Sequence, residues 1–421
     1  MTEVSTRGRN GALPHGVQGA ADSHFAPTLL AFAQMFPGRW FGGGALSVYL
    51  HGQPVVDVWT GYADRRGTVR WGADTGAMVF SATKGMASTV IHRLVDRGLI
   101  DYDVPVADYW PDFGANGKTG ITVRDVMRHR AGLSQLNGLT KGDLLDHELM
   151  EKRLAAAPVN RLLVGRSAYH ALTYGWLLSG LARAVTGVGM RELFRTELAG
   201  PLNTDGLHLG RPPADAPTQA AQVLAPQSTF HNPIFDFFAP RVAGWQLSGA
   251  FGAMYFTGMK AVIQGDTPFL DSEIPSANAV ATARGLAKMY GAIANEGRMD
   301  GGQFLSTRTA NGLAGRTDWS PDWNLFVPLA FHHGFHGLPL AMMPGFGHVG
   351  LGGSLGWADP SSGLAFGFVH NRLLTPMLFD MGAFVGLNML IRCDASRARR
   401  RGYQVVPDFG SPYDEQTPVA G

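Results

Sequence analysis

The order in which residue patterns follow one another along the chain limits the folds open to it. Residues 44–49 and 54–59 alternate apolar with small or polar side chains around His51-Gly52-Gln53, which predicts a β-hairpin. Helical segments and proline-punctuated loops then fill residues 132–240, and strand-like runs return by residues 364–369. This order predicts an α+β, multi-domain protein in which an antiparallel sheet flanked by helices carries an inserted, mostly helical domain.

The domain boundaries are placed where these patterns change. We expect one discontinuous α/β domain, a helical domain inserted into it, and a flexible tail at each end of the chain. In chain order these are the N-terminal tail at 1–25, the α/β domain at 26–125 and 255–405, the helical domain at 126–254, and the C-terminal tail at 406–421.

Helix starts and ends are marked at several points. Ser81 stands at the N-terminus of one predicted helix, and Thr122-Val123-Arg124-Asp125 is typical of a capping box at the start of another. Gly98 and Gly187 follow helical patterns as C-caps. The apolar spacing predicts helices over 81–98, 174–185, 282–295 and 381–401.

Charge and cysteine content exclude several classes of partner and site. The 35 Lys and Arg against 33 Asp and Glu leave a net charge of +2, so we expect no nucleic-acid partner. The single cysteine, Cys393, excludes disulfides within the chain and cysteine-based metal sites. Residues 1–25 lack the apolar core of an export signal, and no run suits a membrane span. The sequence therefore predicts a cytoplasmic protein by default, with association with the cell envelope left open.

The sharpest local signal is Ser81-Ala82-Thr83-Lys84, an S-x-x-K at a predicted helix start. Positions i and i+3 share a helix face, so the Lys84 amine can reach the Ser81 hydroxyl. A lysine with an ordinary pKa of about 10.4 is no base at neutral pH unless burial or positive charge lowers that pKa. An ordinary serine N-cap followed by a surface lysine is the alternative, so the motif needs further partners.

Tyr169-His170-Ala171 and the segment from Asn324 to Ala358 supply candidates for such partners. A phenolic oxygen beside a lysine can relay the serine proton to a leaving group, although a lone tyrosine is more often a core residue. The segment 324–358 contains eight glycines and no Lys, Arg, Asp or Glu. We interpret it as buried strand and loop beside an apolar pocket, and it contains His348-Val349-Gly350.

Two other patterns in this region are interpreted as structural. Gly352-Gly353-Ser354-Leu355-Gly356 matches the G-x-S-x-G nucleophile elbow, but the short steps to Asp359 and His370 leave no room for that fold. We therefore reject Ser354 as the nucleophile. The triplet His332, His333 and His336 suggests a metal cluster, but Gly334 breaks the helix that would align its ends, and no acid lies near.

Taken in order, Ser81-x-x-Lys84, Tyr169-His170-Ala171 and His348-Val349-Gly350 resemble the S-x-x-K, Y-x-N and K-T-G motifs of the serine β-lactamase and penicillin-binding-protein superfamily. Residues 121–133 resemble the segment before the helical domain in its class C enzymes. Ala171 and His348 depart from the asparagine and lysine of β-lactamases, a pattern similar to the family VIII carboxylesterases. The resemblance, over residues 40–400, implies a β-lactamase/transpeptidase-like fold.

The resemblance also implies roles for individual residues. Ser81 would be the nucleophile, Lys84 and Tyr169 would transfer its proton, and the backbone N–H groups of Ser81 and Leu351 would form the oxyanion hole. The residues expected to line the substrate site are His348, Gly350 and Ala171. No cofactor and no metal are implied.

We therefore expect a cofactor-independent esterase or lipase that hydrolyses short- to medium-chain carboxylic esters through an acyl-enzyme. The loss of the third-motif lysine removes a fixed cation for a β-lactam or peptide carboxylate. A β-lactamase, a D-amino-acid peptidase and an inactive ligand-binding homologue remain alternatives. For lipid substrates, the uncharged window Val242 to Met259 suggests an interfacial loop or lid, and hence peripheral lipid contact.

Overall fold

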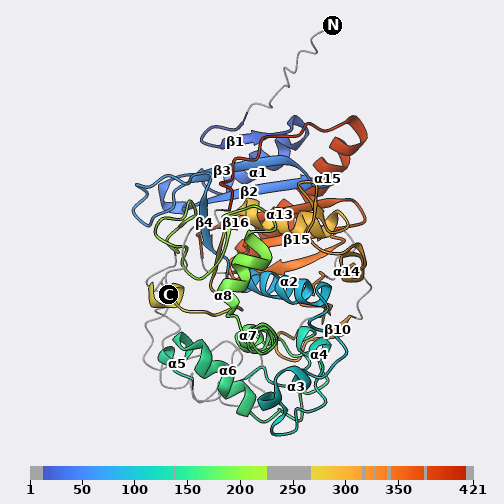
Figure 1. Cartoon of the computed structure of the whole chain (residues 1–421). Coiled ribbons are helices and arrows are strands. Elements are labelled where there is room, and N and C mark those ends of the chain that lie inside the picture. The colour runs from blue at the N-terminus through green and yellow to red at the C-terminus, as the bar shows by residue number, and fades with distance from the viewer. Residues whose placement is uncertain are drawn as a thin grey trace.

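A mixed arrangement of one large antiparallel sheet and two groups of helices makes up the protein (Figure 1). The computed structural model describes residues 13–135, 139–224, 267–314, 319–326, 328–338, 343–373 and 377–413. Within these ranges the sheet runs in the order β1 (Gln18–Ala21), β3 (Gln53–Gly61), β2 (Gly43–Leu50), β16 (Leu364–His370), β15 (Leu355–Asp359), β14 (Phe346–Val349), β13 (Phe335–His336) and β12 (Phe331–His332). The predicted α+β class is confirmed.

Helices cover both faces of the sheet, so its central strands are buried on both sides. Residues of α1 (Ala26–Gln34) and α15 (Met377–Arg401) pack into one of the two cores, whereas residues of α13 (Ala283–Ala294) and α2 (Thr83–Asp96) pack into the other. Along β16, Phe366 and Phe368 pack into one core while Ala365 and Val369 pack into the other. This two-sided burial explains why β16 reads as a continuous apolar run.

A second group of helices occupies the middle and the lower half of the molecule (Figure 1). They are α3 (Val106–Tyr109), α4 (Val123–Met127), α5 (Lys141–Leu145), α6 (His147–Ala156), α7 (Thr173–Thr186) and α8 (Met190–Leu193). Helix α7 is central to this group, because α3, α4 and α6 all pack against it. It also contacts α2, which joins the helical part to the sheet part.

Smaller elements complete the description. A second sheet has the order β5 (Leu207–Leu209), β7 (Ala279–Ala281), β4 (Thr75–Met78) and β6 (Gln219–Ala220). Two-residue strands form the pairs β8 (Arg298–Met299) with β9 (Gly302–Gln303) and β10 (Ser320–Pro321) with β11 (Pro328–Leu329). Short helices are α12 (Thr267–Asp271), α14 (Thr307–Leu313), η1 (Ser23–Phe25), η2 (Arg39–Phe41), η3 (Phe80–Ala82), η4 (Pro111–Gly114) and η5 (Phe194–Ala199).

The predicted hairpin and helix signals are confirmed. β2 and β3 pair antiparallel through a turn in which His51 and Gly52 both have positive φ. Thr122 and Asp125 form the reciprocal bonds of a capping box at the start of α4. Helix α7 ends at Gly187, whose left-handed conformation (φ 73°) suits a residue without a Cβ.

Described parts of both predicted tails contact the rest of the fold. Residues 18–21 form the edge strand β1, paired with β3, so the N-terminal prediction is wrong for the described residues 13–25. At the other end, Val406 N–H donates to Pro54 O, and the Asp408 carboxylate pairs with Lys288 at 2.7 Å. These long-range contacts hold residues 406–413 against the fold, and no local sequence pattern predicts them.

Some predictions fall on parts of the chain that the structure does not describe. The window Val242 to Met259 and the expected boundary between residues 254 and 255 lie outside the described residues. Across the described ranges, no helix combines the length and the apolarity needed to cross a membrane.

Candidate active site

Ser81 lies at a sharp turn between a strand and a helix. Strand β4 ends at Met78, the 3-10 turn η3 contains Ser81, and α2 begins two residues later at Thr83. Phe80 has a positive φ of 47°, a conformation that costs free energy for a bulky residue. The turn leaves the Ser81 side chain partly accessible at the N-terminal end of α2.

Lys84 is fully buried on the first turn of α2, directed at Ser81. Its Nζ lies 3.2 Å from Ser81 Oγ, and it donates to the carbonyl oxygens of Ala171 at 2.7 Å and Ser276 at 2.9 Å. None of these three partners carries a charge. Burial without a countercharge lowers the pKa of Lys84 well below its ordinary value.

Tyr169 completes a cluster with these two side chains. Burial raises the pKa of the Tyr169 phenol. A hydrogen bond between its hydroxyl and the Ser81 side chain partly opposes that rise. Lys84 Nζ lies 5.0 Å from the centre of the Tyr169 ring. The structure thus brings together Ser81 and Lys84 of the first motif and Tyr169 of the second.

The backbone around Tyr169 is held by residues that sequence analysis missed. The buried Asp322 carboxylate accepts the Tyr169 N–H at 3.1 Å and the Ser167 hydroxyl at 2.9 Å. Asn324 donates to Tyr169 O at 2.9 Å. Asp322 and Asn324 lie more than 150 positions from Tyr169, so no local spacing indicated the contact.

His129 is another residue that the sequence did not single out. Its ring lies 5.0 Å from the Tyr169 ring and 4.4 Å from Phe331, and its Nδ1 accepts the His170 N–H. Burial is the main reason that the pKa of His129 lies well below its ordinary value. The side chain therefore packs against Tyr169 as a neutral ring.

Ala171 contributes through its backbone. Its carbonyl oxygen is the closest hydrogen-bond partner of Lys84 Nζ, whereas its methyl group is buried beside Tyr169 and Phe331. The substrate-binding role expected of Ala171 remains a prediction, because its side chain offers only a small apolar surface there.

His348 lies on β14, near Tyr169. The two ring centres are 6.3 Å apart, and His348 is also 4.9 Å from the His336 ring. Burial, with smaller contributions from His336 and Lys84, lowers the pKa of His348 well below its ordinary value. Its Nδ1 lies 3.1 Å from Val349 O, and its Nε2 finds no hydrogen-bond partner among the described residues. A neutral side chain therefore stands where the resemblance places a lysine.

The turn after β14 lies against the segment that leads to Ser81. A Cβ on Gly350 would come within 2.1 Å of Val79 O, so only glycine allows this approach. Leu351 follows directly and is partly accessible. The two backbone segments expected to form the oxyanion hole are therefore neighbours.

Ser354 is part of the sheet framework, in keeping with its rejection as a nucleophile. It is buried at the start of β15, where its Oγ accepts the His370 N–H at 3.2 Å and lies 3.3 Å from His370 O. Its hydroxyl bonds backbone groups of the neighbouring strand.

The triplet of histidines is divided among different partners. His332 Nε2 lies 3.0 Å from Gly312 O, His333 faces Arg124, and His336 Nε2 accepts the Val349 N–H. Among the described residues, no group of three or more His, Cys, Asp or Glu side chains is placed to hold a metal ion.

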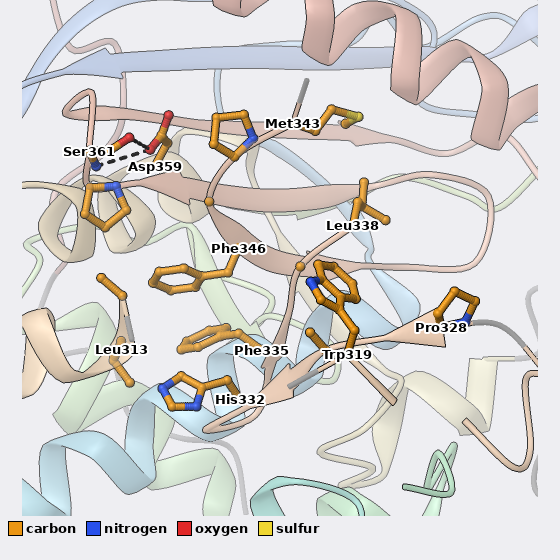
Figure 2. Close-up of a pocket in the computed structure, with 16 residues that line it drawn as sticks. Leu313, Trp319, Pro328, His332, Phe335, Leu338, Met343, Phe346, Asp359 and Ser361 are labelled. Carbon is orange, nitrogen blue, oxygen red and sulfur yellow. Dashed lines mark hydrogen bonds between the residues drawn. The ribbon is translucent and has the colours of Figure 1, made fainter. Parts of the chain in front are cut away.

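A cavity of 690 Å³ lies at the edge of the sheet, near the start of β14 (Figure 2). Phe335 and Phe346 lie side by side within it, with Leu313 and His332 beyond them and Trp319 opposite. Much of its lining comes from the uncharged segment, which was expected to border an apolar pocket. Ser81, Lys84 and Tyr169 do not line this cavity.

Comparisons with known proteins identify relatives of the whole chain. The family model described as Beta-lactamase matches residues 30–386. The chain is 63% identical over 408 residues to the "Esterase/beta-lactamase LipL" of Mycobacterium tuberculosis (strain ATCC 25618 / H37Rv), covering 96% of this chain and 95% of that protein.

Solved structures extend the likeness to the fold. A family VIII carboxylesterase superposes with a TM-score of 0.75 at 30% identity, over 88% of this chain and 99% of the other. A penicillin-binding-protein homologue from Caulobacter crescentus superposes with a TM-score of 0.76 at 29% identity, over 90% and 99%. These matches confirm the predicted β-lactamase/transpeptidase-like fold. With a family model that spans most of its length and a near-full-length relative, the chain belongs to the beta-lactamase family.

Proposed function

We propose that the protein is a serine hydrolase that cleaves carboxylic esters of short to medium chain length through an acyl-enzyme on Ser81. The observation that carries this proposal is the environment of the Lys84 amine. A neutral amine has two N–H groups and one lone pair. The carbonyls of Ala171 and Ser276 can only accept, so they take both N–H groups. The lone pair is then left for the Ser81 hydroxyl, 3.2 Å away.

This arrangement supports general-base catalysis. Ser81 Oγ attacks the ester carbonyl carbon while its proton passes to Lys84 Nζ, and the carbonyl electrons move onto the oxygen. The N–H groups of Ser81 and Leu351 stabilise that oxyanion. When the tetrahedral adduct collapses, the C–O bond to the alcohol breaks and the alkoxide takes a proton through Tyr169. Water, activated by the same groups, then releases the acid and regenerates Ser81.

The charge of the site favours uncharged substrates. Burial lowers the pKa of His348 and of Lys84 and so favours the neutral form of both side chains, which makes neither a fixed cation for a substrate carboxylate. An ester has no carboxylate to hold. Two relatives support the same substrate class: LipL, whose name includes esterase, and the family VIII carboxylesterase.

Hydrolysis of β-lactams is the second candidate, favoured by the second half of the LipL name. The same nucleophile would open the lactam by attack on its carbonyl carbon. The neutral His348 predicts weaker binding of the β-lactam carboxylate, and therefore slower turnover than of esters.

The test is turnover of p-nitrophenyl esters of increasing chain length, and of a chromogenic cephalosporin, by the wild type, Ser81→Ala and Ser354→Ala. We expect Ser81→Ala alone to lose both activities. Ser354→Ala is the matched control, because it removes the hydroxyl of the competing G-x-S-x-G serine. Loss of turnover in Ser354→Ala with retention in Ser81→Ala would contradict the proposal, as would a wild type that cleaves no ester.

A further inference from the structure

Two loops beside the candidate active site expose large apolar side chains to solvent. Leu162 and Val164 in the first loop are 51% and 38% exposed, and Trp323 and Phe326 in the second are 43% and 74% exposed. Single exposed apolar residues are common, but a cluster of them indicates an interaction site.

Direct contacts join the two loops into one surface. The backbone N–H of Trp323 donates to Ser167 O at 2.8 Å. The Arg166 guanidinium lies over the Trp323 ring, 4.5 Å from its centre. The aromatic face is our name for this surface, which consists of Arg161, Leu162, Val164, Arg166, Trp323 and Phe326.

Phe326 is held in an unfavourable conformation at the most exposed point of this face. Its φ of 56° lies in the left-handed region, which is rare for bulky side chains. Its N–H donates to Asp322 O at 2.9 Å, and the Asp322 carboxylate also accepts the N–H groups of Asn324 and Leu325. The strained backbone costs free energy, and the exposed ring recovers none of it by burial in the protein core. This points to a partner outside the protein that would bury the Phe326 ring.

The charge of the aromatic face has one sign. Arg161 and Arg166 are both exposed, and residues 157–168 contain no Asp or Glu. In residues 319–326 the single acid is Asp322, which is 1% exposed and occupied by hydrogen bonds within the loop. The face therefore combines aromatic side chains with positive charge and exposes no negative charge from these two segments.

The face also adjoins the candidate catalytic cluster. The same Asp322 that shapes the second loop accepts the Tyr169 N–H, and Asn324 donates to Tyr169 O. A body bound to this face would therefore lie next to the site that contains Tyr169.

We propose that the aromatic face docks the protein onto an anionic lipid–water interface. Trp323 and Phe326 would enter the headgroup region, where aromatic rings are favoured, while Arg161 and Arg166 pair with lipid phosphates. The charge complementarity selects an anionic lipid surface over a neutral one. This proposal goes beyond ester hydrolysis and does not depend on the role of Ser81, because its readout is binding.

The experiment is co-sedimentation of the full chain with two kinds of vesicle, phosphatidylcholine alone and phosphatidylcholine with an equal part of phosphatidylglycerol. We expect the wild type to bind the anionic vesicles and to dissociate as salt is raised. Phe326→Gly removes the ring while relieving the positive φ, so the variant should fold at least as well and bind about tenfold more weakly. Arg161→Gln and Arg166→Gln should each weaken binding about fivefold.

The matched control is Trp40→Ser, which removes a tryptophan that is 65% exposed elsewhere on the molecule. It should bind as the wild type does, whereas Trp323→Ser should not. Thermal melts check that each variant is folded. The proposal is overturned if the wild type ignores anionic vesicles, if it binds both kinds equally, or if folded Phe326→Gly and Trp323→Ser bind as tightly as the wild type.

Discussion

The chemistry that we assign to Ser81 depends on how one lysine is surrounded. Lys84 is buried among two carbonyls and a hydroxyl, so desolvation acts on its pKa with no carboxylate to oppose it. Lys118 is a buried lysine of similar surroundings, since its Nζ donates to the carbonyls of Ala115 and Ala157, but no serine motif accompanies it. The pairing with Ser81 therefore distinguishes Lys84.

Replacement of Lys84 by arginine tests this directly. A guanidinium stays protonated at any working pH and has no lone pair to accept the Ser81 proton. We expect kcat for a p-nitrophenyl ester to fall by at least about hundredfold in Lys84→Arg. Lys118→Arg, measured per mole of folded protein, should keep its kcat. Equal kcat in Lys84→Arg and the wild type would rule out Lys84 as the base.

Asp322 is predicted to act on Tyr169 by positioning its backbone. Removing the carboxylate in Asp322→Ala leaves four hydrogen-bond donors without their acceptor, including the Tyr169 N–H. We expect a loss of about 1–3 kcal/mol of stability and a fall of about tenfold in kcat with little change in KM. Asp322→Asn still offers one oxygen to the backbone N–H groups and should restore most of kcat. A folded Asp322→Ala with wild-type kcat would show that Tyr169 needs no such support.

Only part of this site could be predicted from the sequence. Ser81 and Lys84 are three positions apart at a predicted helix start, so their spacing alone predicts that the two side chains meet. Tyr169 and His348 were found through motif resemblance. Asp322, His129 and the carbonyl of Ser276 were missed, because their contacts depend on how distant loops fold rather than on any local pattern.

Among the elements, helix α13 shows how closely helices approach the sheet that carries the site. It packs against β16, β15 and β2. A Cβ on Gly367 of β16 would lie 2.1 Å from Ala283 O, and one on Gly356 of β15 would lie 2.1 Å from the Tyr290 ring. These glycines therefore set the separation between helix and sheet.

An alanine at position 367 should push α13 away from β16. We expect Gly367→Ala to lower the free energy of unfolding by about 1–3 kcal/mol, because a backbone carbonyl cannot yield as a side chain can. Gly386→Ala is the control, since nothing lies within 4 Å of a Cβ there and the residue is inside α15. It should raise stability by about 0.5–1 kcal/mol. Chemical denaturation measures both, and a neutral Gly367→Ala would show that α13 moves freely.

Element prediction succeeded where local chemistry decides the outcome. The hairpin turn at His51-Gly52, the capping box at Thr122 and the stop at Gly187 each follow from neighbouring residues. It failed at the chain ends, where Val406 and Asp408 are fixed by partners more than a hundred positions away. Polar composition near a terminus predicts fraying only where such partners are lacking.

The molecule as a whole buries many histidines in neutral form. His170 Nε2 accepts the Leu133 N–H, His336 Nε2 accepts the Val349 N–H, and His370 Nδ1 accepts the Arg372 N–H. A ring nitrogen that accepts cannot also carry a proton. Burial accordingly lowers the pKa of His170 and His336 to about 4, and that of His92 and His370 to about 3.

Stability should therefore fall on acidification. Above the ordinary histidine pKa of about 6.5, these side chains are neutral in both the folded and the unfolded protein. Between pH 6.5 and about pH 4, the histidines of the unfolded chain bind protons, whereas those of the folded protein stay neutral. Each such histidine contributes up to about 1.4 kcal/mol per pH unit in that window. Asp57, whose pKa is raised to about 6 chiefly by burial, opposes the trend as a single group. Unfolding free energies that stay flat between pH 6.5 and 4 would contradict this.

The most direct measurement is to locate the covalent acyl group. The wild type is mixed with a p-nitrophenyl ester whose acyl-enzyme is hydrolysed slowly, quenched in acid, digested and examined by tandem mass spectrometry. We predict one acylated residue, Ser81, with no adduct in Ser81→Ala and a much slower adduct in Lys84→Arg. Acylation of another residue during turnover, or ester turnover that persists in Ser81→Ala, would contradict the account.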